Sequence, residues 1–176
     1  LFAPALVAFQ REHPNVEAPV TKEMSFFDVN FWRGMNWYRM HFPLSDEVGP
    51  NNPIMTGESS AYYMFHPLAP QRIAETLPDA KIILLLRNPV MRAFSHYQLN
   101  FRRRNEDLSF EEAVKAEPER LAGEHERLLA DPAYYSFHHD KHSYLARGRY
   151  VEQVRVWQSL FPPEQLLIEE SSDFFG

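Results

Sequence analysis

The 176-residue sequence contains no cysteine and only six glycines. Without cysteine the chain forms no disulfide, no thiolate nucleophile and no cysteine-ligated metal site. No apolar run approaches the roughly 20 residues that a membrane-spanning helix needs, and no signal peptide is visible, so we expect a cytoplasmic protein. The formal net charge of −6 argues against nucleic-acid binding through general positive charge, although it permits a local basic pocket for one phosphorylated nucleotide.

The length suits one domain with a substantial hydrophobic core, and we expect residues 1–176 to form a single domain. The chain starts at Leu1, inside a helix that the pattern predicts over residues 2–12. We therefore expect it to be a fragment, or a chain whose start is missing. Further helices are predicted over residues 29–42, 67–77 and 109–130.

Residues 81–97 organise the rest of the chain. The apolar run from Ile82 to Leu86 predicts a strand buried on both faces of a parallel sheet. Arg87 ends that strand, Asn88 is suited to cap the following helix, and Pro89 suits the first helical position. This order of elements predicts an α/β fold.

Helical spacing gives the helix after Pro89 two unlike faces. One face carries Val90, Ala93, Phe94, Tyr97 and Phe101, and we expect it to pack on the sheet. The other carries Asn88, Arg92 and Ser95, and we expect it to look toward the carboxyl edge of the sheet, where open α/β folds bind ligands. A guanidinium, a hydroxyl and a helix N-terminus together make an anion site.

This stretch resembles the 3′-phosphate-binding strand and helix of sulfotransferases that use 3′-phosphoadenosine 5′-phosphosulfate (PAPS). In that family an arginine at the strand end and a serine eight residues later hold the 3′-phosphate, and Arg87 and Ser95 have this separation. The alternative is an ordinary βα unit whose arginine lies in solvent. The resemblance implies a three-layer α/β/α fold with a central parallel sheet, like that of P-loop nucleotide kinases. It also implies transfer of a sulfuryl group to a hydroxyl or amino acceptor, with adenosine 3′,5′-bisphosphate (PAP) as product and no metal.

Residues 22–28 (KEMSFFD) resemble the Lys-Glu-x-x-(Phe/Tyr)-Phe-Asp segment that lines the acceptor site in the heparan sulfate branch of the family. The resemblance makes Glu23 the catalytic base, because a carboxylate within reach can take the acceptor's proton. Lys22 is a catalytic candidate that would neutralise charge on the transferring group. The alternative is a solvated ion pair. The remaining acceptor-site candidates are Phe26 and Phe27, as core or pocket wall, and Asp28, for which capping of the next helix is the alternative.

Residues 57–63 (GESSAYY) resemble the family's Gly-Glu-Lys-(Ser/Thr)-Pro-x-Tyr element, which often lines the acceptor side. Glu58, Ser59 and Tyr62 are therefore candidates for binding the acceptor, with structural roles as the alternative for Glu58 and Tyr62. Ser59 stands where lysine is usual and Ala61 where proline is usual. The change at Ser59 argues against a basic contact to an anionic glycan.

Residues 143–150 (SYLARGRY) resemble the family's Arg/Lys-Gly-x-Tyr loop, which closes over the 3′-phosphate. Glycine lets backbone N–H groups approach an anion, and flanking cations add charge. The nucleotide-binding candidates are Arg147, Gly148, Arg149 and Tyr150. A helix that ends before Pro162, and then a strand at residues 165–169, are predicted to follow.

Three other charged segments have simpler interpretations. The run from Arg102 to Arg104 predicts a solvated face, with a patch for an anionic acceptor as the alternative. Ser109 and Glu112 form a capping box that opens the helix predicted after them. His138, His139 and His142 predict a flexible polar loop in preference to a metal site.

The motifs stand in family order and predict a sulfotransferase whose acceptor is a glycan or a small or carrier-bound metabolite. Family members open with a lysine-containing loop that grips the 5′-phosphosulfate, and this sequence begins just after it, so we expect the isolated chain to transfer sulfate poorly. One rival is a non-catalytic module that binds a 3′-phosphonucleotide. The other is a P-loop kinase-like phosphoryl transferase, which would need a Walker loop and a magnesium-binding aspartate that the sequence does not show.

Overall fold

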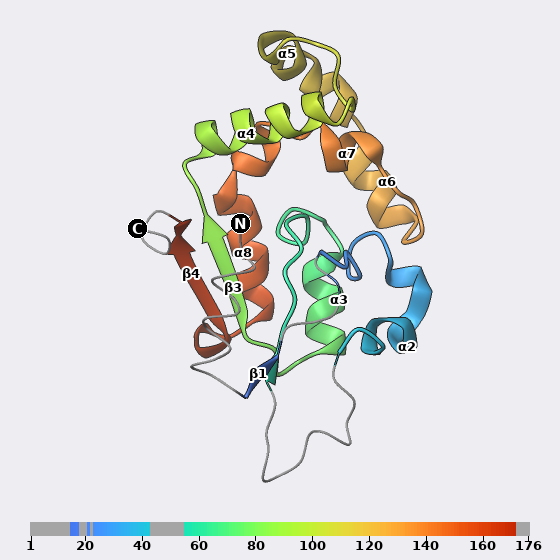
Figure 1. The fold of residues 1–176 in the computed structure, drawn as a ribbon, viewed down its shortest axis with the longest axis vertical. Helices are drawn as coiled ribbons and strands as arrows, with labels where there is room; N and C mark the ends of the chain where they lie inside the picture. Colours follow the sequence, from blue (N-terminus) through green and yellow to red (C-terminus); the bar gives the residue numbers. More distant parts are fainter. Residues whose placement is uncertain (1–14, 18–20, 22, 43–54, 172–176) are drawn as a thin grey trace. The chain divides into compact units, whose positions relative to one another are not determined.

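The computed structural model describes residues 15–17, 21, 23–42 and 55–171 of the chain (Figure 1). The chain divides into two compact units, residues 1–61 and residues 62–176. Lys22 and the helix expected over residues 2–12 lie outside the described residues. None of the helices in the described part has the length and apolar character that crossing a bilayer requires, and the cytoplasmic location stays a prediction.

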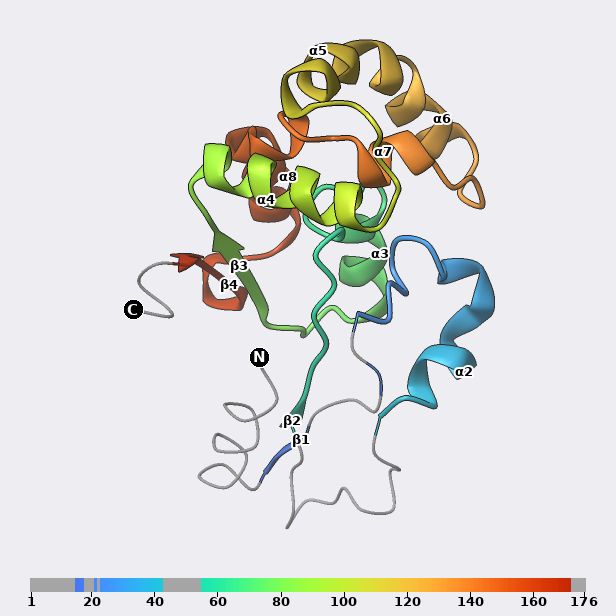
Figure 2. The same ribbon diagram turned by 45° about the horizontal axis from the view of Figure 1, so that its top comes forward.

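The second unit contains a parallel pair of strands. β3 (Ile82–Leu86) lies beside β4 (Leu166–Glu170), with Ile82 opposite Leu166 and Leu86 opposite Glu170 (Figures 1 and 2). Parallel neighbours need a long crossover, and here the crossover contains five of the unit's α-helices. The predicted α/β character is confirmed, and the strand expected at residues 165–169 begins one residue later.

The two faces of β3 are not equally covered. Leu84 is 6% exposed, whereas Ile83 is 56% exposed and Leu85 is 40% exposed. Successive side chains of a strand point to opposite faces, so the described residues cover only the face that carries Leu84. The expectation that this strand is buried on both faces is therefore wrong for the described structure.

Helix α4 (Pro89–Arg102) begins as the sequence predicts. The Asn88 side-chain oxygen accepts hydrogen bonds from the backbone N–H groups of Val90, at 3.0 Å, and Met91, at 3.2 Å. Pro89 occupies the first helical position, where the missing N–H costs no hydrogen bond. The cap and the proline together place the start of α4 directly after the end of β3.

The buried face of α4 differs from the expected one. Ala93 and Asn100 are each 2% exposed, whereas Val90, Phe94 and Phe101 are exposed. The helix has its main contacts with η3 (Ala146–Gly148), and of the expected apolar face Ala93 and Tyr97 pack inward, in the cluster around Tyr144. The buried face differs because polar side chains form hydrogen bonds on the inner face. Arg92 donates to the Tyr144 carbonyl, Tyr97 donates to the Leu108 carbonyl at 3.0 Å, and Asn100 donates to the Lys141 carbonyl at 2.6 Å.

The other helices of this unit form where the sequence predicts them, with two differences. The stretch 109–130 forms two helices, because Gly123 adopts a left-handed φ of 74° between them. The three histidines expected in a loop lie in and directly after a short helix, α7. The capping box of Ser109 and Glu112 is confirmed. The helices are α3 (Ala69–Thr76), α5 (Phe110–Leu121), α6 (Glu124–Ala130), α7 (Phe137–Lys141), α8 (Tyr150–Leu160) and η4 (Pro163–Gln165).

The first unit is built around aromatic side chains. The single helix expected over residues 29–42 is instead a turn, η1 (Phe31–Arg33), followed by α2 (Gly34–Arg39). Phe26 and Phe27 are 0% and 1% exposed, and their ring centroids lie 4.6 and 5.2 Å from that of Tyr38. A short parallel pair joins β1 (Val16–Glu17) to β2 (Met55–Thr56).

Helix α4 ends in a left-handed residue that is not glycine. Arg104 has a φ of 58°, its N–H donates to the Phe101 carbonyl at 3.1 Å, and the Asn105 N–H donates to the Asn100 carbonyl at 2.9 Å. These two bonds form the Schellman arrangement, which glycine adopts without steric cost.

We predict that Arg104→Gly raises the free energy of unfolding by about 0.5–1 kcal/mol, because glycine removes the Cβ clash at this φ. Urea denaturation would measure the change. Arg103→Gly is the matched control, since Arg103 is also exposed but has an ordinary φ of −85° and should show no gain. Equal effects of the two substitutions would contradict the prediction.

Candidate functional site

A pocket of about 390 Å³ opens at the carboxyl ends of β3 and β4. It is lined by residues 86–89, by Tyr150 and by residues 168–170. These residues come from the end of β3, the start of α4, the start of α8 and the end of β4. Open α/β sheets bind ligands at this edge, so the pocket lies where the sequence predicts the anion site.

Arg87 and Tyr150 meet at this pocket although 63 positions separate them in the chain. The Tyr150 hydroxyl donates a hydrogen bond to the Arg87 carbonyl oxygen at 2.9 Å, while the Arg87 side chain is exposed. Glu169 and Glu170 also line the pocket and add negative charge. The positive potential that this pocket could offer an anion comes from the Arg87 guanidinium and the N-terminal end of α4.

The loop before α8 is fixed by a buried carboxylate. Glu117 is 4% exposed, and its two oxygens accept the backbone N–H groups of Leu145 and Ala146, each at 2.7 Å. The loop then passes so close to α4 that a Cβ on Gly148 would lie 3.1 Å from the Cβ of Pro89. Glycine at this position is thus explained by close approach of the loop to the first residue of α4.

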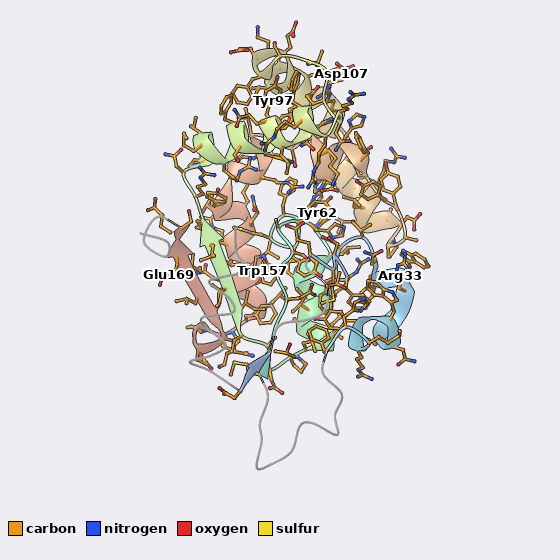
Figure 3. All side chains as sticks on the ribbon, viewed as in Figure 1. Arg33, Tyr62, Tyr97, Asp107, Trp157 and Glu169 are labelled. Carbon is orange, nitrogen blue, oxygen red and sulfur yellow. The ribbon has the colours of Figure 1, made fainter. Side chains whose placement is uncertain are left out.

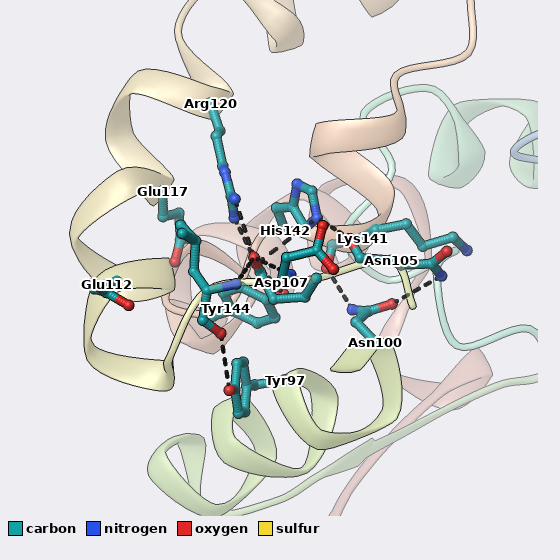
Figure 4. A network of polar contacts seen from close by, with 12 residues as sticks. Tyr97, Asn100, Asn105, Asp107, Glu112, Glu117, Arg120, Lys141, His142 and Tyr144 are labelled. Atoms are coloured by element: carbon teal, nitrogen blue, oxygen red, sulfur yellow. Dashed lines mark hydrogen bonds and ion pairs between the residues drawn. The ribbon is translucent and has the colours of Figure 1, made fainter. Parts of the chain in front are cut away.

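A second buried carboxylate, that of Glu106, holds Tyr144, the residue directly before the two amides that Glu117 binds. Glu106 is 3% exposed and accepts hydrogen bonds from both terminal nitrogens of Arg120, at 2.6 and 3.1 Å, and from the Tyr144 hydroxyl at 2.9 Å. Figure 4 shows the polar network to which Arg120 and Tyr144 belong. Burial alone would raise the pKa of Glu106, but the hydrogen bonds from Arg120 and its other donors lower it to about 2. The charged form of Glu106 is therefore part of the folded structure.

Arg147 is held inside the second unit. Its Nε donates to the Ser143 hydroxyl at 2.8 Å, and its Nη2 donates to the carbonyl of Asp140 and to its carboxylate, the latter at 3.2 Å. The guanidinium lies 4.6 Å from the centre of the Tyr62 ring. Burial by itself would raise the pKa of Asp140, but the hydrogen bond from Lys141 and the charge of Arg147 lower it.

Tyr62 is 6% exposed, and its hydroxyl lies 2.7 Å from Nδ1 of His139 in the interior of the unit (Figure 3). In this buried position Tyr62 is better placed to pack against Arg147 than to contact an acceptor. Arg149 is exposed and lies 3.7 Å from the carboxylate of Glu152. Ser95 is exposed on α4 and is not among the residues that line the pocket. The structure thus brings Arg87 and Tyr150 together at the pocket, with Gly148 against α4, while the roles of Ser95, Arg147 and Arg149 stay predictions.

In the first unit, Glu23 is exposed on a left-handed backbone. The φ angles of Glu23 and Ser25 are 49° and 48°, a conformation that costs a non-glycine residue on the order of 1–3 kcal/mol and that clusters at functional sites. Asp28 is buried and accepts the N–H of Val29, whereas Asn30 occupies the N-cap position of η1. The expected capping role of Asp28 is therefore not observed.

The other acceptor candidates of this unit differ in exposure. Phe26 and Phe27 belong to the core, which is one of the two roles expected of them. Glu58 is half-buried and Ser59 is exposed. Sequence reasoning missed Glu117, which lies in a helix of alternating charge and carries no pattern that separates it from its exposed neighbours.

Buried histidines surround Arg147. Burial, followed by the charge of Arg72, lowers the pKa of His66 to about 3, and burial, followed by the charge of Arg147, lowers the pKa of His139 to about 4. The remaining charges near His139 come from His125, Asp140 and Glu124. Among the described residues, no group of three or more His, Cys, Asp or Glu side chains has the arrangement of a metal site.

We predict that acid destabilises this unit. Because His66 and His139 stay neutral in the folded state and bind protons near pH 6.5 when unfolded, the free energy of unfolding should fall as the pH drops from about 6.5 toward 4. The slope should reach about 1.4 kcal/mol per pH unit for each histidine. Urea denaturation at a series of pH values would measure it, and a flat profile between pH 7 and 5 would contradict the prediction.

The contact between Gly148 and Pro89 gives a second prediction. Gly148→Ala should lower the free energy of unfolding by about 1–3 kcal/mol, because the new methyl group presses on a helix-starting proline that has little freedom to move. Gly57→Ala is the matched control, since a Cβ there meets no atom of the described residues within 4 Å. Thermal unfolding of both variants would test the difference, and equal shifts would argue against the close contact.

Comparison with known proteins agrees with this geometry. The model of a family described as the sulfotransferase family matches residues 11–152. The chain is 31% identical, over 175 residues, to a bifunctional heparan sulfate N-deacetylase/N-sulfotransferase 1 of Caenorhabditis elegans, and the match covers 96% of this chain and 18% of that protein. It is 32% identical, over 163 residues, to the mouse heparan sulfate glucosamine 3-O-sulfotransferase 3A1, and here the match covers 93% of this chain and 36% of that protein.

A solved structure is also similar. The crystal structure of a sulfotransferase from Alicyclobacillus acidocaldarius matches with a TM-score of 0.72 and 30% identity. The match covers 98% of this chain and 69% of that one. Since the family model covers well over half of the sequence and this structure shares both fold and residues, the chain belongs to the sulfotransferase family.

Proposed function

We propose that the chain takes part in PAPS-dependent transfer of a sulfuryl group to a hydroxyl or amino group of a glycan. The main support is the pocket at the ends of β3 and β4, where the arginine and tyrosine of two separate family motifs meet. The chain spans only 18% of the length of the N-deacetylase/N-sulfotransferase relatives, so the activity of those whole proteins enters here only as a proposal.

The pocket would hold the 3′-phosphate of the donor. Arg87 supplies an exposed guanidinium, the N-terminal end of α4 supplies positive potential, and Tyr150 fixes the carbonyl behind Arg87. This donor set fits an anion. By resemblance, Ser95 and the loop residues Arg147, Gly148 and Arg149 complete the nucleotide site.

The acceptor end would use Glu23. Its carboxylate takes the proton from the acceptor hydroxyl or amine while the acceptor's oxygen or nitrogen forms a bond to sulfur. The bond between sulfur and the 5′-phosphate oxygen breaks, and its electron pair leaves with PAP. Lys22 would neutralise charge on the transferring group, and the scheme uses no metal ion.

The acceptor proposal is supported by the relatives, whose names include heparan sulfate sulfotransferases that act on nitrogen and on oxygen. Ser59 stands where the family has a lysine, so recognition of the acceptor here does not use a cation at this position. A small or carrier-bound hydroxyl compound is the competing acceptor in the experiment below.

Two substitutions test the proposal. Glu23→Gln should lower turnover by about 10²–10⁴-fold, because the amide takes no proton, while stabilisation by PAP in a thermal-shift experiment remains. Arg87→Ala should remove most of the stabilisation by PAP. The matched controls are Glu75→Gln on α3 and Arg155→Ala on α8, which are exposed and lie outside the proposed site.

The measurements are made on the complete gene product with PAPS and with N-deacetylated heparosan, heparan sulfate or a small alcohol as acceptor. Full turnover in Glu23→Gln would overturn the base assignment. Stabilisation by ATP with magnesium but not by PAP would favour a phosphoryl transferase, and PAP binding without turnover on any acceptor would favour a binding module.

A further inference from the structure

The turn that carries Glu23 is held in a conformation that the backbone does not favour by itself. Among the described residues, the non-glycine residues with positive φ are Glu23, Ser25 and Arg104. Two of the three thus fall within three consecutive positions of the first unit. Such a backbone persists only where surrounding contacts hold it.

One set of contacts comes from the residues that follow the turn. The Asn30 side-chain amide donates to the Met24 carbonyl at 3.0 Å, and the Asn30 backbone N–H donates to the Ser25 carbonyl at 2.9 Å. Met24 itself is 3% exposed. The carbonyl side of the turn is therefore fixed locally.

The other contact comes from a segment 35 positions away. The Ser25 N–H donates to the Ser60 hydroxyl oxygen at 3.0 Å, and the Ser60 hydroxyl donates in turn to Glu58 Oε2 at 3.4 Å. A hydroxyl that donates its proton to a carboxylate presents its lone pairs to the Ser25 N–H. The carboxylate thereby orients the hydroxyl that fixes the amide side of the turn.

Glu58 is anchored in the aromatic core. It accepts a hydrogen bond from Tyr38. The pKa of the Tyr38 phenol is raised, mainly by burial and further by the charge of Glu58 and by this hydrogen bond. Tyr38 is 7% exposed, and its ring stacks on that of Phe26 with the centroids 4.6 Å apart. A continuous chain of contacts therefore runs from the core through Glu58 and Ser60 to the turn at Glu23.

We propose that Glu58 is a positioning residue that acts through Ser60 to hold the turn that presents Glu23. The proposal rests on the proposed function, in which Glu23 is the base. Glu58 itself touches neither acceptor nor donor in this role, which replaces the acceptor contact expected from the sequence. A displacement of about 1 Å at a catalytic group can cost about 100-fold in rate, so loss of the Ser60 contact should appear mainly in kcat.

The contact and its catalytic consequence are measured separately. Ser60→Ala should speed hydrogen exchange of the Ser25 amide at least about tenfold and lower kcat about 10–100-fold, with the acceptor KM and PAP stabilisation unchanged. Ser60→Thr keeps the hydroxyl and should retain slow exchange and turnover. Ser159→Ala on α8 removes a comparable local hydrogen bond, from Ser159 to the Val156 carbonyl, and should change neither measurement.

Substitutions at Glu58 separate positioning from direct contact with the acceptor. Glu58→Gln keeps an oxygen that accepts from Ser60 and Tyr38, so it should retain most of the turnover, whereas Glu58→Ala should behave like Ser60→Ala. A rise in acceptor KM in Glu58→Gln as large as in Glu58→Ala would overturn the proposal in favour of an acceptor contact.

The outcomes also separate this proposal from the proposed function. Unchanged exchange of the Ser25 amide in Ser60→Ala would overturn the positioning role. Full turnover in Ser60→Ala together with an inactive Glu23→Gln would overturn the positioning role and leave the base assignment in place. Full turnover in Glu23→Gln would overturn both.

Discussion

The hydrogen bonds to the buried carboxylate of Glu117 are the interaction on which the loop before α8 depends. The carboxylate accepts two successive backbone N–H groups, Leu145 and Ala146, and so fixes the path of the loop before α8. A carboxylate in the interior is costly unless its oxygens are satisfied, and here each accepts a hydrogen bond of 2.7 Å. From this point the loop reaches Pro89 at the start of α4, and α8 begins with the tyrosine that bonds to Arg87.

Each of the two units contains an irregular segment that a carboxylate holds in place. In the second unit Glu117 holds backbone amides directly, and in the first unit Glu58 accepts the hydrogen bond of the Ser60 hydroxyl, which holds the Ser25 amide. In both cases polar side chains, buried at Glu117 and half-buried at Glu58 and Ser60, fix irregular backbone, which helices and strands do not fix by themselves. In the proposed function such residues would keep a site precise without touching a ligand.

The main errors of the sequence analysis have one physical cause. Helical spacing and apolarity placed Phe94 and Phe101 inside and Arg92 outside, whereas in the structure both phenylalanines are exposed and Arg92 is half-buried. A polar side chain that completes a hydrogen bond in the interior loses little by burial, and no periodicity reveals the partner, which for Arg92 lies 52 positions away. The same reason hid Glu117 among the exposed charges of its helix.

The sequence by itself determined the features that depend on neighbours in the chain. These include the strand before Arg87, the cap at Asn88, the capping box at Ser109 and the motifs that identify the family. Only the tertiary structure decided which polar side chains turn inward, why glycine is needed at position 148, and what holds the turn at Glu23. Local signals are set by backbone geometry over a few residues, whereas these features depend largely on contacts between distant segments. The Glu117 hydrogen bonds span 28 and 29 positions, the Ser25–Ser60 bond spans 35 and the Arg92–Tyr144 bond spans 52.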